Sequence, residues 1–291
     1  MPPYDDLSLT QKSQVTPQPP HVVRPFLKWA GGKARLAPQI RSQLPPGSRL
    51  IEPFAGSAAV WLATDYPQAL VADVNVDLIM LYQTLQREGP KFIAYCQTFF
   101  TDETNTPNVY YALRHQFNTT KCLREKAALF LYLNRHGYNG LCRYNGSGKY
   151  NVPFGRYRKP YFPEMEMHMF WHKAPHATFL VSDFRTVLAH AQLGDVVYCD
   201  PPYVPLSATA NFTDYAASGF SLQDHDDLAR EAERLGSEGI PVVISNHATP
   251  WTRARYHHAS QTILSVPRSI SRDGSRRQAV DEIIAVFGKR A

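Results

Sequence analysis

The stretch from Leu50 to Asp73 constrains the fold more than any other part of this 291-residue chain. An apolar run at residues 50–54 leads into a turn of sequence Ala-Gly-Ser, and a helical pattern follows over residues 57–64. A second apolar run, at residues 69–72, ends at Asp73. Short apolar runs of this kind are typical of buried parallel strands. Strand, glycine turn, helix, strand and terminal acid together predict a nucleotide-binding βαβ unit and an α/β fold.

Beyond Asp73 the pattern changes twice. Residues 76–134 predict helices, including a long amphipathic helix over residues 123–134. Residues 135–163 are rich in Gly, Asn, Tyr, Arg and Pro and have no clear period. So long a loop inside a compact protein is usually functional or disordered, and its aromatic content argues against disorder.

The second half of the chain returns to alternating strands and helices. Residues 222–235 predict an amphipathic helix, and four β-branched-rich runs predict strands. These runs are residues 178–181, 196–199, 242–245 and 283–287. We therefore expect one α/β domain, formed by residues 22–74 and 165–291 and split by a mostly helical insertion at residues 75–164. Residues 1–21, which are rich in Pro, Gln, Ser and Thr, are expected to form a disordered leader.

Charge and hydropathy limit the classes of partner. The net charge of +6 and the pI near 9.1 favour a polyanionic partner, although many basic proteins bind no nucleic acid. No apolar run approaches the length that spans a bilayer, and the amino terminus lacks a signal-peptide pattern. The sequence therefore predicts no membrane association.

Cysteine and histidine spacing gives no sign of a metal site. The cysteines occur singly and form no CxxC pair, which predicts reduced thiols in a cytosolic protein. His168 and His172, and the adjacent pair His257 and His258, lack a partnering carboxylate or cysteine cluster, so we expect no metal at either. The cysteines are Cys96, Cys122, Cys142 and Cys199.

The glycine turn suits a particular kind of cofactor. It holds one glycine, Gly56, and not the GxGxxG spacing that binds a dinucleotide pyrophosphate. Asp73 ends the next strand, where a carboxylate can accept hydrogen bonds from ribose hydroxyls. A cofactor with a ribose but no phosphates fits this turn better than NAD, and S-adenosylmethionine is such a cofactor.

A second motif, Asp200-Pro201-Pro202-Tyr203, directly follows the apolar strand at residues 196–199. Ligands of open α/β sheets bind beyond the carboxyl ends of strands, so this tetrapeptide faces the site. An exocyclic amine on an aromatic ring is a poor nucleophile because its lone pair is delocalised. The Asp200 carboxylate and the Pro201 carbonyl can accept its two protons, which localises the lone pair, while Tyr203 stacks on the base.

A third motif, Phe-Leu-Lys-Trp-Ala-Gly-Gly-Lys, covers residues 26–33. Its paired glycines permit close approach of the backbone to a ligand. Taken alone, however, this segment is more simply a cationic helix start. Residues 205–212, which follow the second motif, are predicted to form a flexible flap.

The three motifs, in this order, resemble those of the Dam-type adenine-N6 DNA methyltransferases of the D12 or alpha group. The resemblance extends from about residue 25 to residue 287, with departures at residues 146–149 and 182–184 that leave flanking-sequence preference open. Further similar segments are residues 131–135, 137–145, 150–157, 200–213 and 268–271.

The resemblance implies a Rossmann-like S-adenosylmethionine-dependent methyltransferase sheet with an inserted, mostly helical DNA-recognition domain. Residues 22–74 and 165–291 then form the catalytic domain, and residues 75–164 form the target-recognition domain. The implied protein is a monomer that contains no metal and binds double-stranded DNA. It comes from a bacterium or a phage and lies in the bacterial cytoplasm, where its DNA substrate places it at the nucleoid. The implied reaction is N6 methylation of the adenine flipped out of duplex GATC.

The resemblance also implies roles for single residues. Asp200, Pro201, Pro202 and Tyr203 are the catalytic residues. Asp183 and Phe184 hold the cofactor adenine, since Asp-Phe is common at this point in the wider family. The full set of implied cofactor contacts is Trp29, Ala30, Gly31, Lys33, Phe54, Gly56, Ser57, Asp73, Asp183, Phe184 and Asp200.

For DNA contacts, the resemblance implies that the Tyr138 side chain inserts into the base stack beside the flipped adenine. It also implies that Arg143 recognises a guanine of the target. Arginine to guanine O6 and N7 is the commonest specific contact in the major groove. Leu141 and Pro153 face a thymine methyl, and Lys28 contacts the first guanine. Arg135, Arg156 and Arg158 are expected to contact phosphates. The implied DNA contacts are Lys28, Arg114, Tyr138, Asn139, Leu141, Arg143, Asn145, Asn151, Pro153, Arg156 and Tyr157.

Four other functions are considered. A cytosine-N4 methyltransferase usually carries Ser, and a protein-glutamine methyltransferase Asn, where this chain has Asp200. An adenine methyltransferase of a restriction system with another target shares every catalytic motif. A catalytically silent DNA-binding regulator should have lost Asp200, Tyr203 or the glycine turn, and all are intact.

Overall fold

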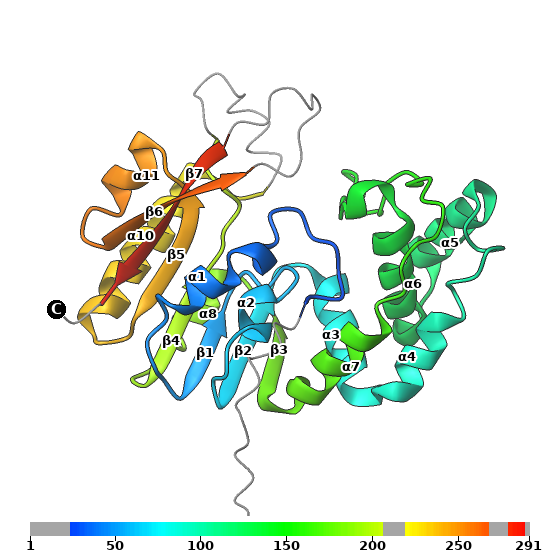
Figure 1. Cartoon of the computed structure of the whole chain (residues 1–291), viewed down its shortest axis with the longest axis horizontal. Coiled ribbons are helices and arrows are strands. Elements are labelled where there is room, and N and C mark those ends of the chain that lie inside the picture. Colours follow the sequence, from blue (N-terminus) through cyan, green and yellow to red (C-terminus); the bar gives the residue numbers. More distant parts are fainter. Residues whose placement is uncertain (1–23, 206–218, 268–278, 289–291) are drawn as a thin grey trace, which may run out of the picture.

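One mixed sheet of seven strands runs through the part of the chain that the computed structural model describes, residues 24–205, 219–267 and 279–288. Its order is β3-β2-β1-β4-β5-β7-β6 (Figure 1). The five strands β1 to β5 are parallel, whereas β7 is antiparallel to both β5 and β6. The predicted α/β class is confirmed. The strands are β1 (Arg49–Glu52), β2 (Gln68–Asp73), β3 (Ala177–Val181), β4 (Asp195–Cys199), β5 (Val242–His247), β6 (Ser260–Pro267) and β7 (Ala279–Phe287).

The predicted βαβ unit is present, with a shorter helix than expected. Strand β1 leads through the glycine turn into α2 (Ala59–Leu62), and β2 returns parallel to β1 and ends at Asp73. The prediction of helix over residues 57–64 was too long because Ala58 has a φ of 56°, in the left-handed region. The chain therefore becomes helical only at Ala59.

Helices cover both faces of the sheet. On one face lie α8 (Phe184–Leu188) and α10 (Leu222–Ser237), whose Leu228, Ala232 and Leu235 are buried. The amphipathic pattern over residues 222–235 predicted α10 correctly, and Ser221 begins it with a capping box. The other face is covered by α2, α3 (Val76–Glu88) and α7 (Glu164–Lys173). Two further short helices are α1 (Ala37–Arg41), whose Ile40 belongs to the buried cluster of this second face, and α11 (Pro250–Arg255).

Beside the β3 edge, α3 connects the sheet to three further helices (Figure 1). These are α4 (Pro90–Gln97), α5 (Pro107–Thr119) and α6 (Leu123–His136). The expectation that α6 is amphipathic is wrong beyond its first turn, since residues 127–136 are all buried. The reason is that α6 contacts α3, α4 and α5 and is surrounded by them. Buried side chains of these helices and of the sheet form one continuous cluster.

Two further differences from the sequence predictions concern irregular or exposed segments. Strand β6 was not predicted, because as an edge strand it contributes no buried apolar run. The loop 135–163 contains the 3-10 helix η2 (Tyr138–Gly140) and two isolated bridges, Gly137 to Phe154 and Tyr144 to Tyr150.

The predicted leader, most of the flap and the similar segment 268–271 lie outside the described residues. Within the described residues no helix has the length and apolar character needed to cross a membrane.

Candidate functional site

A cavity of about 570 Å³ opens at the carboxyl ends of β1, β2 and β4. Because these neighbouring strands are parallel, the segments that follow them meet at one edge of the sheet. Every residue predicted to be catalytic or to bind the cofactor lines this cavity. They are Trp29, Ala30, Gly31, Lys33, Phe54, Gly56, Ser57, Asp73, Asp183, Phe184, Asp200, Pro201, Pro202 and Tyr203.

The glycine turn is tied to the end of β2 by Asp73. Its carboxylate accepts hydrogen bonds from the backbone N–H groups of Gly56 (3.0 Å) and Asn75 (2.9 Å). Burial raises the pKa of Asp73, and these backbone hydrogen bonds oppose the rise. Gly56 has a φ of +45°, and a Cβ atom there would lie 2.8 Å from Nε1 of Trp29. Glycine is therefore required both by the backbone conformation and by the indole beside it.

Glu52, the last residue of β1, was part of the predicted turn motif but received no role. Its side chain is buried and lines the cavity. The carboxyl group has a backbone hydrogen bond from Trp61, whereas Oε1 has no hydrogen-bond partner in the part of the chain that the structure describes. Burial raises the pKa of Glu52 to about 8, more than that hydrogen bond and nearby Lys173 lower it. A buried acceptor without a partner at a cavity wall is suited to a donor on a ligand.

The Asp200–Tyr203 motif begins with an ion pair. Asp200 Oδ1 lies 2.9 Å from the Lys33 ammonium and accepts a hydrogen bond of 2.8 Å from the Ser245 hydroxyl. Lys33 also donates to the carbonyl of Gly31 at 2.6 Å. Both contacts of Asp200 use Oδ1, so Oδ2 has no partner among the described residues. The carboxylate therefore keeps one oxygen for a ligand in the cavity.

The rest of the motif is held by residues from other strands and helices. The Tyr203 hydroxyl donates to Glu282 of β7 at 2.8 Å, and His225 of α10 hydrogen-bonds the Pro202 backbone. Val204 N–H donates to Asn246 Oδ1 at 3.0 Å. Sequence reasoning missed these supporting residues, because their strands and helices are brought to the motif only by the topology of the sheet.

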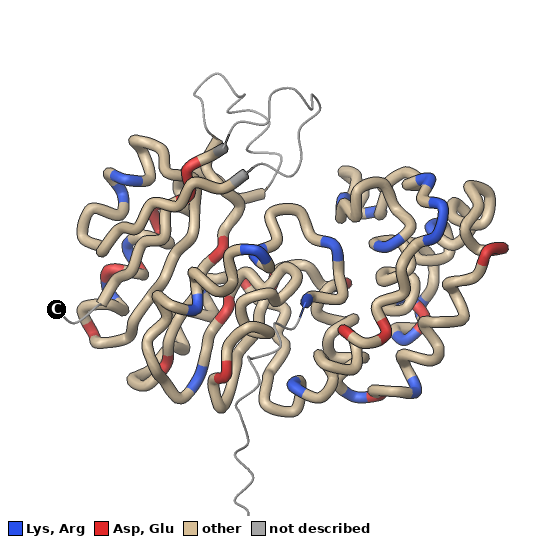
Figure 2. The backbone as a smooth tube through the Cα atoms, in the orientation of Figure 1, with Lys and Arg blue, Asp and Glu red and all other residues tan. Residues whose placement is uncertain are grey.

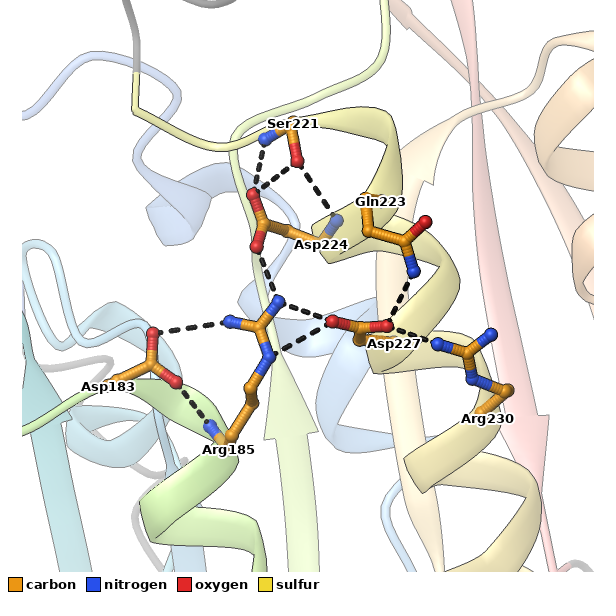
Figure 3. A network of polar contacts seen from close by, with 7 residues as sticks. All are labelled: Asp183, Arg185, Ser221, Gln223, Asp224, Asp227 and Arg230. Carbon is orange, nitrogen blue, oxygen red and sulfur yellow. Dashed lines mark hydrogen bonds and ion pairs between the residues drawn. The ribbon is translucent and has the colours of Figure 1, made fainter.

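An ionic network fixes another part of the cavity wall, which includes Asp183 and Asp224 (Figure 3). The Arg185 guanidinium bonds Asp224 and Asp227 of α10 at 2.5 Å each, and it lies 3.5 Å from Asp183. Asp183 also caps α8 through the Arg185 N–H. Burial tends to raise the pKa of Asp224, but hydrogen bonds from Arg185 and Ser221 outweigh it and lower this pKa to about 2. The network therefore joins the start of α8 to the start of α10.

The charge of the lining limits the ligand. Lys33 is the one lysine or arginine among the described residues that line the cavity, and it is paired with Asp200. The rings of Phe54 and Phe184 stack at 5.4 Å and give the wall an apolar part. Carboxyl groups predominate in the lining. The pKa of about 8 leaves Glu52 largely protonated near pH 7, but the aspartates suit a cationic ligand with a ribose and disfavour phosphates. The carboxyl groups belong to Glu52, Asp73, Asp183, Asp200 and Asp224.

A second group of predicted residues meets around η2. The Lys28 ammonium lies 4.0 Å from the centre of the Tyr157 ring, whose hydroxyl accepts the Asn139 N–H at 2.9 Å. Buried Asn134 donates to the Lys28 carbonyl and accepts its N–H, and so fixes this segment on α6. Tyr138 beside them is 52% exposed. The structure therefore brings Lys28, Tyr138, Asn139 and Tyr157 together on one surface.

The remaining predicted DNA contacts lie on the loop beyond η2 or beside it. Exposed Arg143 donates from Nε to Asn151 Oδ1 at 2.7 Å, so these two side chains are paired. Asn145 uses its Oδ1 to accept the N–H groups of residues 147 and 149 within a turn. Arg114 donates to the Val152 carbonyl. Leu141 is half-buried, whereas Pro153 and Arg156 are exposed.

Cationic side chains gather on this part of the protein. Figure 2 shows lysines and arginines along the upper part of the helical unit as viewed. Arg156, Arg158 and Lys159 are exposed there, as a phosphate-binding surface requires. Arg135 is an exception to the predicted phosphate role: it is buried, donates to the Tyr161 carbonyl at 2.9 Å, and cannot reach DNA. Its position on the enclosed half of α6 explains the difference.

Comparison with known proteins identifies the family of the chain. Residues 29–270 match the family model of the D12 class N6 adenine-specific DNA methyltransferase. A DNA adenine methylase of Serratia marcescens is 50% identical over 265 residues, 91% of this chain and 98% of that protein. Those of Salmonella typhi and Escherichia coli (strain K12) are 50% and 48% identical over 264 residues, 91% of this chain and 95% of each. The chain belongs to the D12 class of N6 adenine-specific DNA methyltransferases.

Proposed function

We propose that this enzyme methylates N6 of the adenine in double-stranded GATC, with S-adenosylmethionine as methyl donor, after turning that adenine out of the helix. The observation that carries the proposal is the single cavity lined by both the glycine turn and the Asp200–Tyr203 motif. A ribose-binding turn and an amine-accepting motif in one cavity fit a methyl transfer to a nucleobase better than either motif does alone.

The lining fits S-adenosylmethionine by its chemistry. This cofactor supplies a methyl group activated by a sulfonium, and it carries a ribose and an ammonium but no phosphates. Asp73 can accept from the ribose hydroxyls, and the unpartnered Oε1 of Glu52 can accept from the ammonium. Asp183 and Phe184 would hold the adenine of the cofactor at the far wall.

Asp200 and Pro201 activate the target amine. Oδ2 of Asp200 and the Pro201 carbonyl accept hydrogen bonds from the two N6–H groups, so that the nitrogen lone pair points toward the methyl carbon. Bound S-adenosylmethionine would supply the methyl carbon to this lone pair, with its sulfur as the leaving group, and the Asp200 carboxylate would take the surplus proton of N6. Tyr203 stacks on the adenine and holds its plane. No covalent bond to the enzyme forms.

The surface around η2 is proposed to read the DNA, and residues 75–164 to act as the target-recognition unit. Arg143 would contact guanine O6 and N7, and Tyr138, which is 52% exposed, would fill the space of the extruded adenine. Lys28 would contact the first guanine, and Leu141 and Pro153 a thymine methyl. The exposed arginines Arg156 and Arg158 would contact phosphates.

Methylation of plasmid DNA by the purified protein tests cofactor, base and target together. After incubation with S-adenosylmethionine, the plasmid is challenged with one endonuclease blocked by methylated GATC and with another that requires it. Protection from the first and cleavage by the second support the whole proposal. Methyl incorporation without protection would replace GATC by another target, as in a restriction system. No incorporation by folded, cofactor-binding protein would favour a silent DNA-binding protein.

A further inference from the structure

Strand β7 brings a carboxylate to the catalytic motif from the far end of the chain. Because β7 is antiparallel to β5, its amino-terminal part lies at the edge where the parallel strands end. In this register Glu282 of β7 is opposite His247, the last residue of β5. The Tyr203 hydroxyl donates a hydrogen bond of 2.8 Å to Oε2 of Glu282.

The same cross-strand pair holds the motif at further points. The His247 ring meets the Tyr203 ring edge to face, with 4.8 Å between their centres. His247 Nδ1 lies 2.7 Å from the carbonyl oxygen of Val204. The Lys33 ammonium lies 4.4 Å from the centre of the Tyr203 ring. Tyr203 is therefore held at its hydroxyl, at its ring and through the backbone of the next residue.

A ring that stacks on an extruded base must keep a defined plane. The side chain of tyrosine can rotate about two bonds. The hydroxyl oxygen lies on the axis of the second rotation, so a hydrogen bond there restricts the first rotation directly. It restricts the ring plane because a phenolic O–H prefers to lie in the plane of its ring. An acceptor with a negative charge makes that hydrogen bond strong. We infer that Glu282 is a positioning residue, which fixes the plane of Tyr203 for the target adenine through this hydrogen bond. This inference rests on the proposed function, in which Tyr203 stacks on the adenine.

The test compares four variants of the full chain. Glu282→Ala removes the acceptor, and Tyr203→Phe removes the donor but keeps the ring. A double variant combines them, and Glu282→Gln keeps an acceptor oxygen. Asp281→Ala, at the exposed neighbouring position on β7, is the matched control. Each is measured by single-turnover methylation, by S-adenosylmethionine affinity, and by fluorescence lifetimes of 2-aminopurine in place of the target adenine.

Glu282→Ala and Tyr203→Phe are each expected to slow methylation about tenfold or more and to reduce the short-lifetime, stacked fraction of 2-aminopurine. The double variant should be no slower than either single variant, because all three lack the same hydrogen bond. Glu282→Gln should stay within about threefold of the wild type, and cofactor affinity should not change.

Three results would overturn the role of Glu282. The first is a set of 2-aminopurine lifetimes in Glu282→Ala equal to those of the wild type. The second is a methylation rate in the double variant that is reduced by the product of the two single effects. The third is a Glu282→Gln variant that methylates as slowly as Glu282→Ala. If Glu282→Ala does not fold, Tyr203→Phe still tests the same hydrogen bond from the other side, and an unchanged rate and lifetime there would be decisive against it. A wild-type protein that gives no lifetime change on binding DNA would instead contradict the base flipping on which the inference depends.

Discussion

The Lys33 ammonium and the Asp200 carboxylate form an ion pair of 2.9 Å, which joins the first and last motifs of the chain across the cavity. Lys33 is only 6% exposed. A charge so well buried is stable only with a partner, so each of these two residues fixes the position of the other. Lys33 begins the short 3-10 helix η1 (Lys33–Arg35), and the pair also brings its ammonium to the Asp200–Tyr203 motif.

Asp200→Ala should abolish methylation while duplex DNA still binds. The variant loses one of the two acceptors for the target amine and leaves the Lys33 ammonium without its carboxylate. We expect the single-turnover rate to fall by roughly 100- to 10,000-fold. Transfer of a labelled methyl group and fluorescence anisotropy of labelled DNA measure the two properties. Asp65→Ala, in a surface ion pair with Arg41, is the control and should behave as wild type. Turnover retained in Asp200→Ala would rule out the proposed mechanism.

Glu52→Gln should change how stability depends on pH. The folded-state pKa of about 8 lies above the ordinary value of 4.5 for glutamate. Between these values the unfolded chain releases the proton and the folded chain keeps it, so the contribution of Glu52 to the free energy of unfolding is full below pH 4.5 and declines up to pH 8. Glutamine does not titrate. The variant should therefore gain stability relative to the wild type as the pH rises from 5 to 8.

Urea denaturation at several pH values measures this difference. Glu164→Gln, at an exposed position, is the matched control and should show no such trend. If the ammonium of S-adenosylmethionine pairs with Glu52, binding at pH 7 should also release a proton in the wild type and not in Glu52→Gln. Calorimetry in buffers of different ionisation enthalpy detects that proton. A stability difference that does not vary with pH would contradict the raised pKa.

Gly56→Ala should weaken cofactor binding. A non-glycine residue at a φ of +45° costs about 1–2 kcal/mol, and the new methyl group would lie 2.8 Å from the Trp29 indole. That indole lines the cavity, so its displacement should lower S-adenosylmethionine affinity by roughly tenfold or more. Gly146→Ala has no atom within 4 Å of the added Cβ and is the control. Titration calorimetry measures both, and equal affinities would show that the turn tolerates a side chain.

Residues that line the cavity could be predicted from the sequence because most of them lie in short contiguous motifs. The glycine turn and the Asp200–Tyr203 motif each directly follow a short apolar strand, and parallel neighbouring strands bring such segments to one edge. Asp73 could be predicted from its place at the end of β2. The resemblance then assigned roles to residues, such as Trp29, whose neighbours alone indicate little.

What could not be predicted depends on contacts between distant segments. Glu282 reaches Tyr203 only because β7 runs antiparallel to β5, and nothing near Glu282 in the sequence indicates that direction. Arg135 follows the pattern of an exposed basic residue, yet the helices around α6 enclose it. Strand β6 lacks buried residues and so lacks the periodic apolar signal that identified the other strands.

Arg143→Ala should relax discrimination at one guanine of the target. In the free protein Asn151 holds the guanidinium through Nε at 2.7 Å, and the side chain is exposed. A bidentate contact to guanine O6 and N7 contributes about 1–3 kcal/mol of discrimination against the wrong base. The ratio of kcat/KM for GATC to that for a site with the first or the last base pair replaced should fall accordingly at one position only.

Arg156→Ala provides the contrast for that measurement. As a phosphate contact it should weaken binding to every sequence alike and reduce the slope of log affinity against log salt concentration by about one. The two variants therefore separate base reading from charge. If Arg143→Ala instead lowers affinity uniformly and changes the salt slope, Arg143 belongs to the phosphate-binding surface with Arg156 and Arg158. The guanine must then be read by another side chain near η2, with Lys28 the first to test.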